Sequence, residues 1–116
     1  MLKIDGTAVG VVKGTALVFS AFENNGEMWA GQGPRVASHT VTFEEAFLSE
    51  PVVHVSINMW DMGSSQNARA DISAEEVSAH GFRIVFRTWG DTRVARIRAD
   101  WMAIGPVRHG DDFVGI

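Results

Sequence analysis

Histidines and aspartates are the side chains with which this chain could perform acid–base or metal chemistry. The histidines are His39, His54, His80 and His109. They do not show a metal-ligand spacing such as H-x-x-x-H, and the chain has no cysteine to supply a thiolate ligand. A single histidine in a strand is usually structural. The sequence therefore predicts neither a metal site nor a cofactor.

The carboxylates do not form a convincing catalytic pair either. The candidates are Asp61, Asp71, Asp91 and Asp100. Each is expected to have an arginine nearby in the sequence or on a neighbouring strand, so that charge pairing is the simpler explanation. The segment GQGPR lacks the Lys-Ser/Thr pair of a phosphate-binding loop, and the chain has no G-x-S-x-G motif. We expect no enzyme and no catalytic residue.

Two tryptophans lie in stretches that could bind a ligand without catalysis. Trp89 precedes Gly90 and Asp91, which predict a tight turn, because glycine tolerates positive φ and aspartate hydrogen-bonds to its own backbone. A large ring there is either a lid over the end of the core or a platform for a ligand. Trp29 is the centre of residues 23–35, ENNGEMWAGQGPR, which is either a plain connection or a ligand loop with free backbone N–H groups.

Alternating apolar residues predict the strands that hold these loops. Residues 81–105 predict two long strands joined by the turn at Gly90 and Asp91, as a hairpin. The expected inward residues are Phe82, Ile84, Phe86 and Thr88 in the first strand, and Ile97, Ala99, Trp101 and Ala103 in the second. The expected outward residues include Arg83 and Arg87 in the first strand, and Arg96, Arg98, Asp100 and Met102 in the second.

Four more strands are predicted before this pair, and residues 1–14 are expected to form an irregular arm or a short edge strand. The strands cover residues 15–22, with Leu17, Phe19 and Ala21 inward, and residues 36–47, 52–60 and 70–77. For residues 70–77 a strand is preferred to a short helix capped by Ser73. In residues 52–60 the outward row is His54, Ser56, Asn58 and Trp60. Beside the outward arginines, this row is typical of a subunit interface. The pattern predicts an all-β antiparallel sandwich or barrel.

Length and charge limit the partners. With 116 residues, of which 46% are hydrophobic, the chain suits one domain. A net charge of −4 argues against nucleic acid as the main partner. The apolar stretch 8–22 is interrupted by Gly10, Lys13, Gly14 and Ser20, so we expect a soluble protein with no membrane insertion and no cleaved signal peptide.

A series of motifs between residues 51 and 105 resembles a known family. The motifs are Pro51 and Val52; Asp61; Asn67 and Arg69; Gly81 and Phe82; Thr88, Trp89, Asp91 and Thr92; and Trp101, Ala103 and Ile104. In order and spacing they resemble the H-type lectin domain, the family of the snail agglutinins and of the C-terminal domain of the discoidins. The resemblance covers residues 29–105.

The resemblance implies a six-stranded antiparallel β-sandwich that forms a trimer or a stacked hexamer and binds galactose or N-acetylgalactosamine near the junction of subunits. Arg69 matches the sugar-binding arginine, and Trp89 matches the tryptophan at the tip. An aromatic face suits the C–H face of a galactose ring, and a guanidinium can donate paired hydrogen bonds to vicinal oxygens.

Further site residues follow from the same alignment, and at three positions this chain differs from the snail agglutinins. Gly31 and Gln32 belong to the binding loop, where Gln32 stands in place of an acidic residue. Gly90 stands in place of a histidine and Ala95 in place of an aromatic residue. Asp91 is either a substitute acidic partner or a residue that only shapes the turn.

Two functions are consistent with these observations. The first is a multivalent lectin for galactose- or N-acetylgalactosamine-type glycans, of the kind that acts in cell adhesion. The alternative is a structural or assembly module of a phage-like particle, a fibre tip or decoration protein, with an altered sugar pocket. The expected location is accordingly a cell surface or a virus-like particle. The predicted organisation is residues 1–28 as N-terminal arm and first strand, 29–105 as lectin-like domain, and 106–116 as C-terminal tail.

Overall fold

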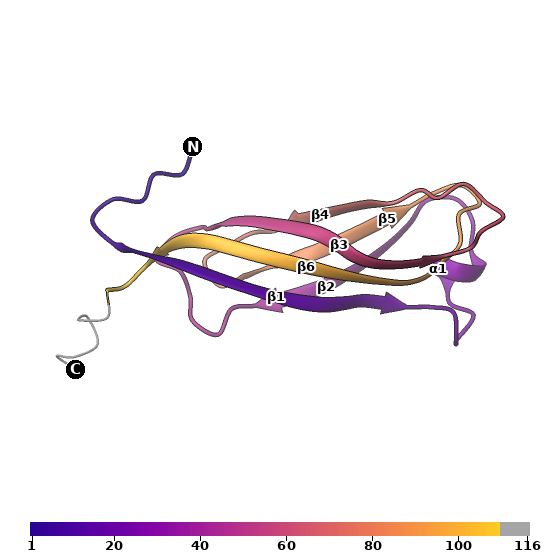
Figure 1. Ribbon diagram of the computed structural model, residues 1–116, viewed down its shortest axis with the longest axis horizontal. Coiled ribbons are helices and arrows are strands. Elements are labelled where there is room, and N and C mark those ends of the chain that lie inside the picture. The colour runs from indigo at the N-terminus through magenta and orange to yellow at the C-terminus, as the bar shows by residue number, and fades with distance from the viewer. Residues whose placement is uncertain (110–116) are drawn as a thin grey trace.

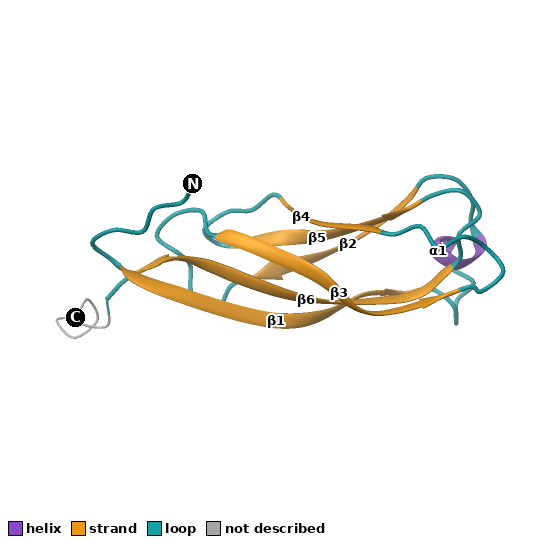
Figure 2. Cartoon of the chain, turned by 45° about the horizontal axis from the view of Figure 1, so that its top comes forward, coloured by secondary structure: helices purple, strands orange, loops and turns teal. Residues whose placement is uncertain are grey.

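Two antiparallel sheets of three strands each form the protein in a computed structural model that describes residues 1–109 (Figure 1, Figure 2). One sheet has the order β1-β6-β3, with β1 at Ala8–Ser20, β6 at Val94–Val107 and β3 at Val52–Met62. The other has the order β2-β5-β4, with β2 at Arg35–Thr42, β5 at Gly81–Thr88 and β4 at Asp71–Glu75. A short helix, α1, covers Glu27–Ala30. The prediction of a six-stranded antiparallel β-sandwich is confirmed.

The core lies between the central strands of the two sheets, and its residues are those that the alternation predicted. Phe82, Ile84 and Phe86 of β5 face the inward row of β6, which includes Ile97 and Ala99. All five residues are at most 2% exposed. Aromatic rings fill the end of the core that is farther from the 89–93 turn. There Phe43 contacts Phe47, Phe82 and Trp101, with ring centroids 5.1–5.9 Å apart.

Strands β5 and β6 do not form the predicted hairpin. β5 pairs with β2 and β4, and β6 pairs with β1 and β3, so that residues 89–93 cross from one sheet to the other. A period of two reveals which face of a strand is buried, but not which strand lies beside it. Even the outward-facing Val85 of β5 is 2% exposed, as expected for a central strand.

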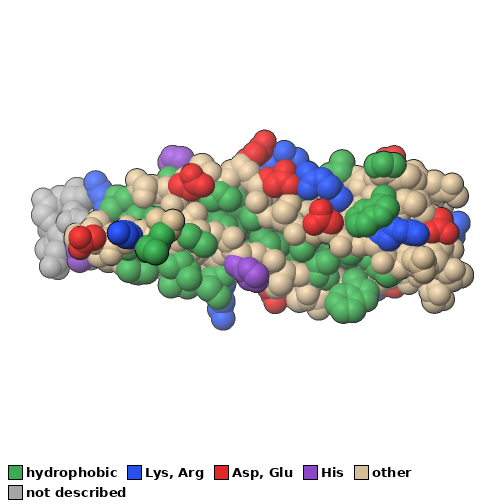
Figure 3. All heavy atoms as spheres, turned by 90° about the horizontal axis from the view of Figure 1, so that it is seen from above, with side chains coloured by type: hydrophobic (Ala, Val, Ile, Leu, Met, Phe, Trp, Pro, Cys, Tyr) green, Lys and Arg blue, Asp and Glu red, His purple; other side chains and the backbone are tan. Residues whose placement is uncertain are grey.

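This crossing separates the arginines that were expected to share one surface. Arg83 and Arg87 lie on the outer face of the β2-β5-β4 sheet, where they pair with Glu76 and Glu75. Figure 3 views the molecule from above the side on which β3 and β4 lie, and shows acidic and basic side chains next to one another. Arg98 does lie beside the β3 row, because its Nε donates to Asn58 Oδ1 over 2.7 Å. The expectation of a single patch was therefore wrong for the two β5 arginines.

Strand β1 is longer than predicted and contains an irregularity. It begins at Ala8 and pairs with β6 along its whole length, so residues 8–14 are not an irregular arm. Its register shifts between Leu17 and Phe19. As a result Val18 is buried and Leu17 is 51% exposed, which reverses the inward position expected for Leu17.

The remaining elements agree more closely with the sequence. β4 confirms a strand in preference to a helix for residues 70–77. α1 lies within the 23–35 stretch, for which only a loop was expected. Pro106 and Val107 belong to β6, and the rest of the predicted tail from residue 110 onward lies outside the described residues. Within residues 1–109, no helix has the length and apolarity that crossing a membrane requires.

Candidate functional site

The 89–93 turn stands at the end of the molecule opposite the start of β1 and the end of β6 (Figure 1). Residues 31–34 and 67–69 lie against this turn. Hydrogen bonds from the side chains of two arginines and two threonines, together with one backbone hydrogen bond, connect these segments to the turn. We call this end of the protein the tip.

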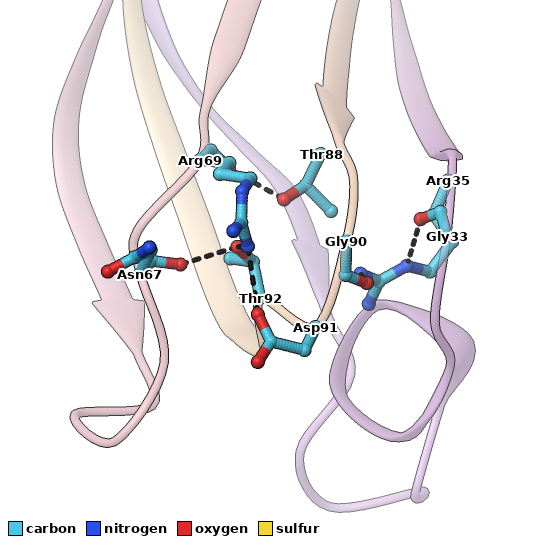
Figure 4. A network of polar contacts seen from close by, with 8 residues as sticks. All are labelled: Gly33, Arg35, Asn67, Arg69, Thr88, Gly90, Asp91 and Thr92. Atoms are coloured by element: carbon cyan, nitrogen blue, oxygen red, sulfur yellow. Dashed lines mark hydrogen bonds and ion pairs between the residues drawn. The ribbon is translucent and has the colours of Figure 1, made fainter.

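Two buried threonines fix the 67–69 segment (Figure 4). The Oγ1 of Thr88, at the end of β5, donates to the backbone oxygen of Arg69 over 2.6 Å. The Oγ1 of Thr92, on the far side of the turn, donates to the backbone oxygen of Asn67 over 2.5 Å. Each threonine is 1% exposed, so both bonds are protected from water. The segment that carries Arg69 is therefore held on both sides of the turn.

The guanidinium of Arg69 lies against the turn itself. Its Nη1 donates to Asp91 Oδ1 over 2.9 Å and to Thr92 Oγ1 over 3.0 Å. Gly90 has φ +69°, and a Cβ added there would lie 2.7 Å from Arg69 Nη1. Glycine adopts this backbone conformation without strain and allows the close approach of the arginine, whereas an added Cβ would require the guanidinium to shift.

The charge pair is partly open to solvent. The side chain of Arg69 is 26% exposed and that of Asp91 is 62% exposed. The hydrogen bond from Arg69 lowers the pKa of Asp91 below its ordinary value of 3.8. At neutral pH the tip therefore presents a carboxylate and a guanidinium in a fixed mutual orientation.

A buried arginine that the sequence reasoning missed ties the glycine-rich loop to the same turn. Arg35 is 4% exposed. Its Nη2 donates to the Gly90 oxygen over 3.1 Å, its Nε to the Gly33 oxygen over 2.9 Å, and its Nη1 to the Met28 oxygen over 3.1 Å. The backbone N–H of Gly33 also donates to the Gly90 oxygen over 2.9 Å. Arg35 therefore holds the glycine-rich loop against the 89–93 turn.

Trp89 is not a buried lid, since it is 47% exposed. It borders a hollow of about 260 Å³. The lining residues are Pro34, Arg35, Val36, Arg87, Thr88 and Trp89. The other tryptophan of this end, Trp29, packs edge-on against Phe22 at 5.1 Å and lies under the guanidinium of Arg93 at 5.3 Å. Of the two rings, Trp89 is the one that borders this hollow.

The structure brings most of the expected site residues together. Arg69, Gly90 and Asp91 are in direct contact, and Trp89 adjoins them in the chain. Gln32 is exposed and next to Gly33, which bonds to Gly90. Gly31 ends α1, and its N–H donates to the Glu27 oxygen.

The other expected charge pairs are found in part. Asp61 pairs with Arg96 at 3.0 Å. Asp100 instead accepts hydrogen bonds from Thr15 and Asn58, at 2.7 and 2.6 Å. Ala95 is 3% exposed and so belongs to the interior.

Comparisons with known proteins agree with this fold. A sequence model of the H-type lectin domain matches residues 38–104. A protein of Fuscovulum blasticum called ATP synthase subunits region ORF 7 is 51% identical over 113 residues, which are 97% of each chain. Wild-type discoidin II from Dictyostelium discoideum is similar in structure with a TM-score of 0.76 at 23% identity, over 90% of this chain and 40% of that chain. Native recombinant discoidin II gives a TM-score of 0.71 at 22% identity, over 91% and 40% of the chains.

These comparisons carry different weight. At identities of 22–23% the discoidin II structures show the fold alone, and this chain spans 40% of their length. The sequence model covers more than half of the chain, from β2 to β6, and includes Arg69 and the 89–93 turn. The protein therefore belongs to the H-type lectin domain family.

Proposed function

We propose that this protein is a lectin that binds galactose- or N-acetylgalactosamine-type glycans at the tip, through Arg69, Trp89, Gly90, Asp91 and the loop of Gly31 and Gln32. The observation that carries the proposal is the contact of Arg69 with Asp91 and Gly90, in the same turn as the exposed Trp89. Family membership supports carbohydrate binding as the general function. The identity of the sugar and the roles of individual residues are the proposed part.

The chemistry of the pair suits a sugar with neighbouring hydroxyl groups. Both contacts of the Arg69 guanidinium to the turn use Nη1, so Nε and Nη2 can donate to a ligand. Asp91 accepts through Oδ1, which leaves Oδ2 to accept from a hydroxyl. A donor and an acceptor held side by side match two adjacent hydroxyl groups, because each hydroxyl can both donate and accept.

Trp89 would supply the apolar part of the site. An indole face packs against the C–H groups of a galactose ring and excludes water from the nearby polar contacts. Asp91 would provide the negative acceptor that Gln32, a neutral amide, cannot. Gly90 permits this arrangement, because a larger residue at that position would displace the guanidinium.

Multivalency forms part of the proposed function. A single shallow site of this size is expected to bind with a Kd of about 1 mM, and several copies on one particle strengthen attachment through effective concentration. We propose that the copies associate as a trimer, or as a stacked pair of trimers, through the outer face of the β1-β6-β3 sheet. That face carries exposed Val11, Val52, Met102 and Ile104 near the end opposite the tip.

Titration of the purified protein with monovalent N-acetylgalactosamine tests the sugar site. Trp89→Ala and Arg69→Ala should each weaken binding by at least about tenfold, since each removes contacts worth about 1–3 kcal/mol. Matched controls are Trp60→Ala, another exposed tryptophan, and Arg83→Ala, another arginine in an exposed ion pair. Both controls should bind as the wild type does.

Three results would count against the proposal in different ways. If the wild type binds no glycan on a broad array, the lectin function falls and the assembly module of a phage-like particle becomes the better hypothesis. If the wild type binds sugar and both Trp89→Ala and Arg69→Ala bind it equally well, the sugar lies elsewhere, and the loop around Trp29 is the next candidate. If it binds only sugars of another configuration, the specificity is wrong and the site stands.

A further inference from the structure

Four exposed residues form a hollow on the outer face of the β2-β5-β4 sheet, where this sheet meets the tip. They are Pro34, Val36, Arg87 and Trp89. Between them in the register lies the buried pair of Arg35 and Thr88, so alternation turns the residues on either side outward. The backbone bond from Gly33 to Gly90 continues this pairing past the ends of the strands. The hollow measures about 260 Å³, and we call it the tip hollow.

The exposed walls of the tip hollow are largely apolar. Val36 is 62% exposed and Trp89 is 47% exposed, so both present apolar surface to solvent. Pro34 adds a ring that has neither an N–H group nor a polar side-chain atom. Neighbouring exposed apolar residues in a concave surface are typical of a binding site, because a ligand there removes their surface from water.

The two arginines of the tip hollow direct their charges elsewhere. Nη1 and Nη2 of Arg87 donate to Glu75 of β4 over 2.6 and 3.3 Å. Since β4 and β2 lie on opposite sides of β5, this pair holds the guanidinium away from Val36 and leaves the methylene groups of Arg87 to line the hollow. Arg35 is buried, and its Nε, Nη1 and Nη2 all donate to backbone oxygens. The hollow therefore suits an apolar group better than an anion.

Trp89 lies between the tip hollow and the segment that carries Arg69. Asp71 of β4 pairs with Arg87, so the register, continued by two residues, places residue 69 beside residue 89. The hydrogen bond from Thr88 Oγ1 to the Arg69 oxygen holds the two segments together at this point. The tip hollow is on the other side of Trp89, toward β2. A ligand that extends across Trp89 can therefore contact both Arg69 and the hollow.

We propose that the tip hollow binds an apolar group attached to the sugar, so that the preferred ligand is a glycoside with an aromatic or aliphatic aglycone. The inference rests on the proposed function, in which Arg69 and Asp91 hold the sugar itself. The aglycone packs against Pro34, Val36 and Trp89, and apolar surface leaves water on both partners. The volume suffices for one ring, because apolar cavities of about 150 Å³ hold benzene.

Calorimetric titration with matched glycosides tests the inference. The methyl and 4-nitrophenyl glycosides of N-acetylgalactosamine share the sugar and differ in the aglycone, and both anomers of each are titrated. In at least one anomer the 4-nitrophenyl glycoside should bind roughly five- to tenfold more tightly, as expected when part of an aromatic ring is buried. Free 4-nitrophenol should not bind at the same concentrations. Equal affinities of the methyl and 4-nitrophenyl glycosides in both anomers overturn the inference and leave the sugar site standing.

A substitution that fills the tip hollow should remove this difference in affinity. Val36→Phe places a ring where the aglycone would lie, so the ratio of the two affinities should fall to about one. Thr40→Phe is the matched control, because Thr40 is exposed on the same strand and outside the hollow. It should keep the wild-type ratio. A wild-type ratio in Val36→Phe contradicts the position assigned to the aglycone.

Valine methyl signals locate the aglycone without reference to affinity. In protein with carbon-13 in the valine methyl groups, the Val36 signals are those that Val36→Thr lacks. The 4-nitrophenyl ring should shift them and the methyl glycoside should not, while the signals of Val11 on the other sheet stay unchanged. If the 4-nitrophenyl glycoside shifts Val36 but binds Arg69→Ala as tightly as the wild type, the ring binds without the sugar and the inference is wrong. If the wild type binds neither glycoside, the proposed function fails and this inference fails with it.

Discussion

The function proposed for Arg69 depends on a neighbour that has no side chain. Gly90 combines a left-handed backbone with close contact to the Arg69 guanidinium, and Arg69 in turn hydrogen-bonds to Asp91. The motif around Trp89 pointed to this turn. It could not reveal the contact with Asp91, because that contact joins residues 22 positions apart in the chain.

Comparing Gly90→Ala with Gly33→Ala separates the cost of backbone strain at positive φ from the cost of displacing Arg69. Both glycines have positive φ, at +69° and +75°, so either alanine should cost about 1–2 kcal/mol in backbone strain. At Gly33 nothing lies within 4 Å of the added Cβ, whereas at Gly90 the Cβ meets Arg69. Chemical denaturation should therefore show a larger loss for Gly90→Ala, which should also weaken sugar binding. Equal losses with unchanged binding would mean that the approach of Arg69 to Gly90 is unimportant.

Trp101 and Trp89 should respond differently to the same substitution. Trp101 packs against Phe82 and Phe43, with ring centroids 5.4 and 5.9 Å away, so Trp101→Ala should cost about 3–5 kcal/mol of unfolding free energy. Trp89 is 47% exposed and leaves no enclosed cavity, so Trp89→Ala should cost much less. Thermal melting of both variants provides the comparison. Equally low melting temperatures would contradict these two environments.

Arg35 shows the limit of the sequence at the residue scale. An arginine after a proline carries no sign of burial. Its backbone partners come from residues 27, 28, 33 and 90, so the network exists only after folding. Thr88 and Thr92 could be recognised from the sequence as part of the family pattern. Their hydrogen bonds to the backbone of residues 67–69 could not be predicted from it.

At the scale of elements, the sequence predicted the faces of strands well and their neighbours poorly. The inward rows of β5 and β6 follow from alternation, because each strand buries one face whatever its partner is. Pairing depends on how the chain crosses between sheets, which the turn at Gly90 does not specify. The Leu17 error has a similar origin, since a register shift changes the face of a residue without any change in the local pattern.

An ion pair between the paired strands β4 and β5 should make stability depend on pH. Arg87 Nη1 donates to Glu75 Oε2 over 2.6 Å, and this bond, together with a hydrogen bond from Ser73 Oγ, lowers the Glu75 pKa from 4.5 to about 2. A carboxylate whose pKa falls on folding stabilises the protein above its unfolded pKa. That contribution is fully present above pH 4.5 and disappears as the pH falls toward 2.

Glu75→Gln should therefore be less stable than the wild type at pH 7, with the difference shrinking between pH 4.5 and 2. Unfolding measured at several pH values checks this expectation. Glu76→Gln, which removes a carboxylate that pairs with Arg83 at 3.3 Å, corrects for the change in net charge. A difference that stays constant down to pH 2 would argue against the pair as its source.

For the whole molecule, the outer face of the β1-β6-β3 sheet is the surface that should associate. It combines exposed Val11, Val52 and Ile104 in one cross-strand row with a polar row that includes Asp100. Asp100 accepts from Thr15 and Asn58, so this polar group is already organised within the sheet. A closed cyclic assembly would cover the apolar row on every copy.

We expect the mass by light scattering at micromolar concentration to be three times that of the chain, or a multiple of three. Ile104→Glu should reduce the mass toward a single chain, because a carboxylate cannot be buried in the apolar row without a large cost. Thr40→Glu adds the same charge on the exposed outer side of β2 and should leave the mass unchanged. A wild-type protein of single-chain mass would refute the trimer.

The pairing of β1 with β6 also sets the order in which the protein can fold during synthesis. Residue 88 completes the β2-β5-β4 sheet, but the other sheet has no central strand until β6 has been made. Ala8 cannot form its pair until Val107 has been synthesised. At about 5–20 residues per second that interval lasts roughly 5–20 s. From residue 88 until β6 has been made, roughly 1–4 s at the same rate, the inner face of the finished sheet, with Phe82, Ile84 and Phe86, has no complete opposing layer. A nascent chain that stalls before Val94 therefore exposes its most apolar surface, and folding must be rapid once the last strand is free or aggregation will compete with it.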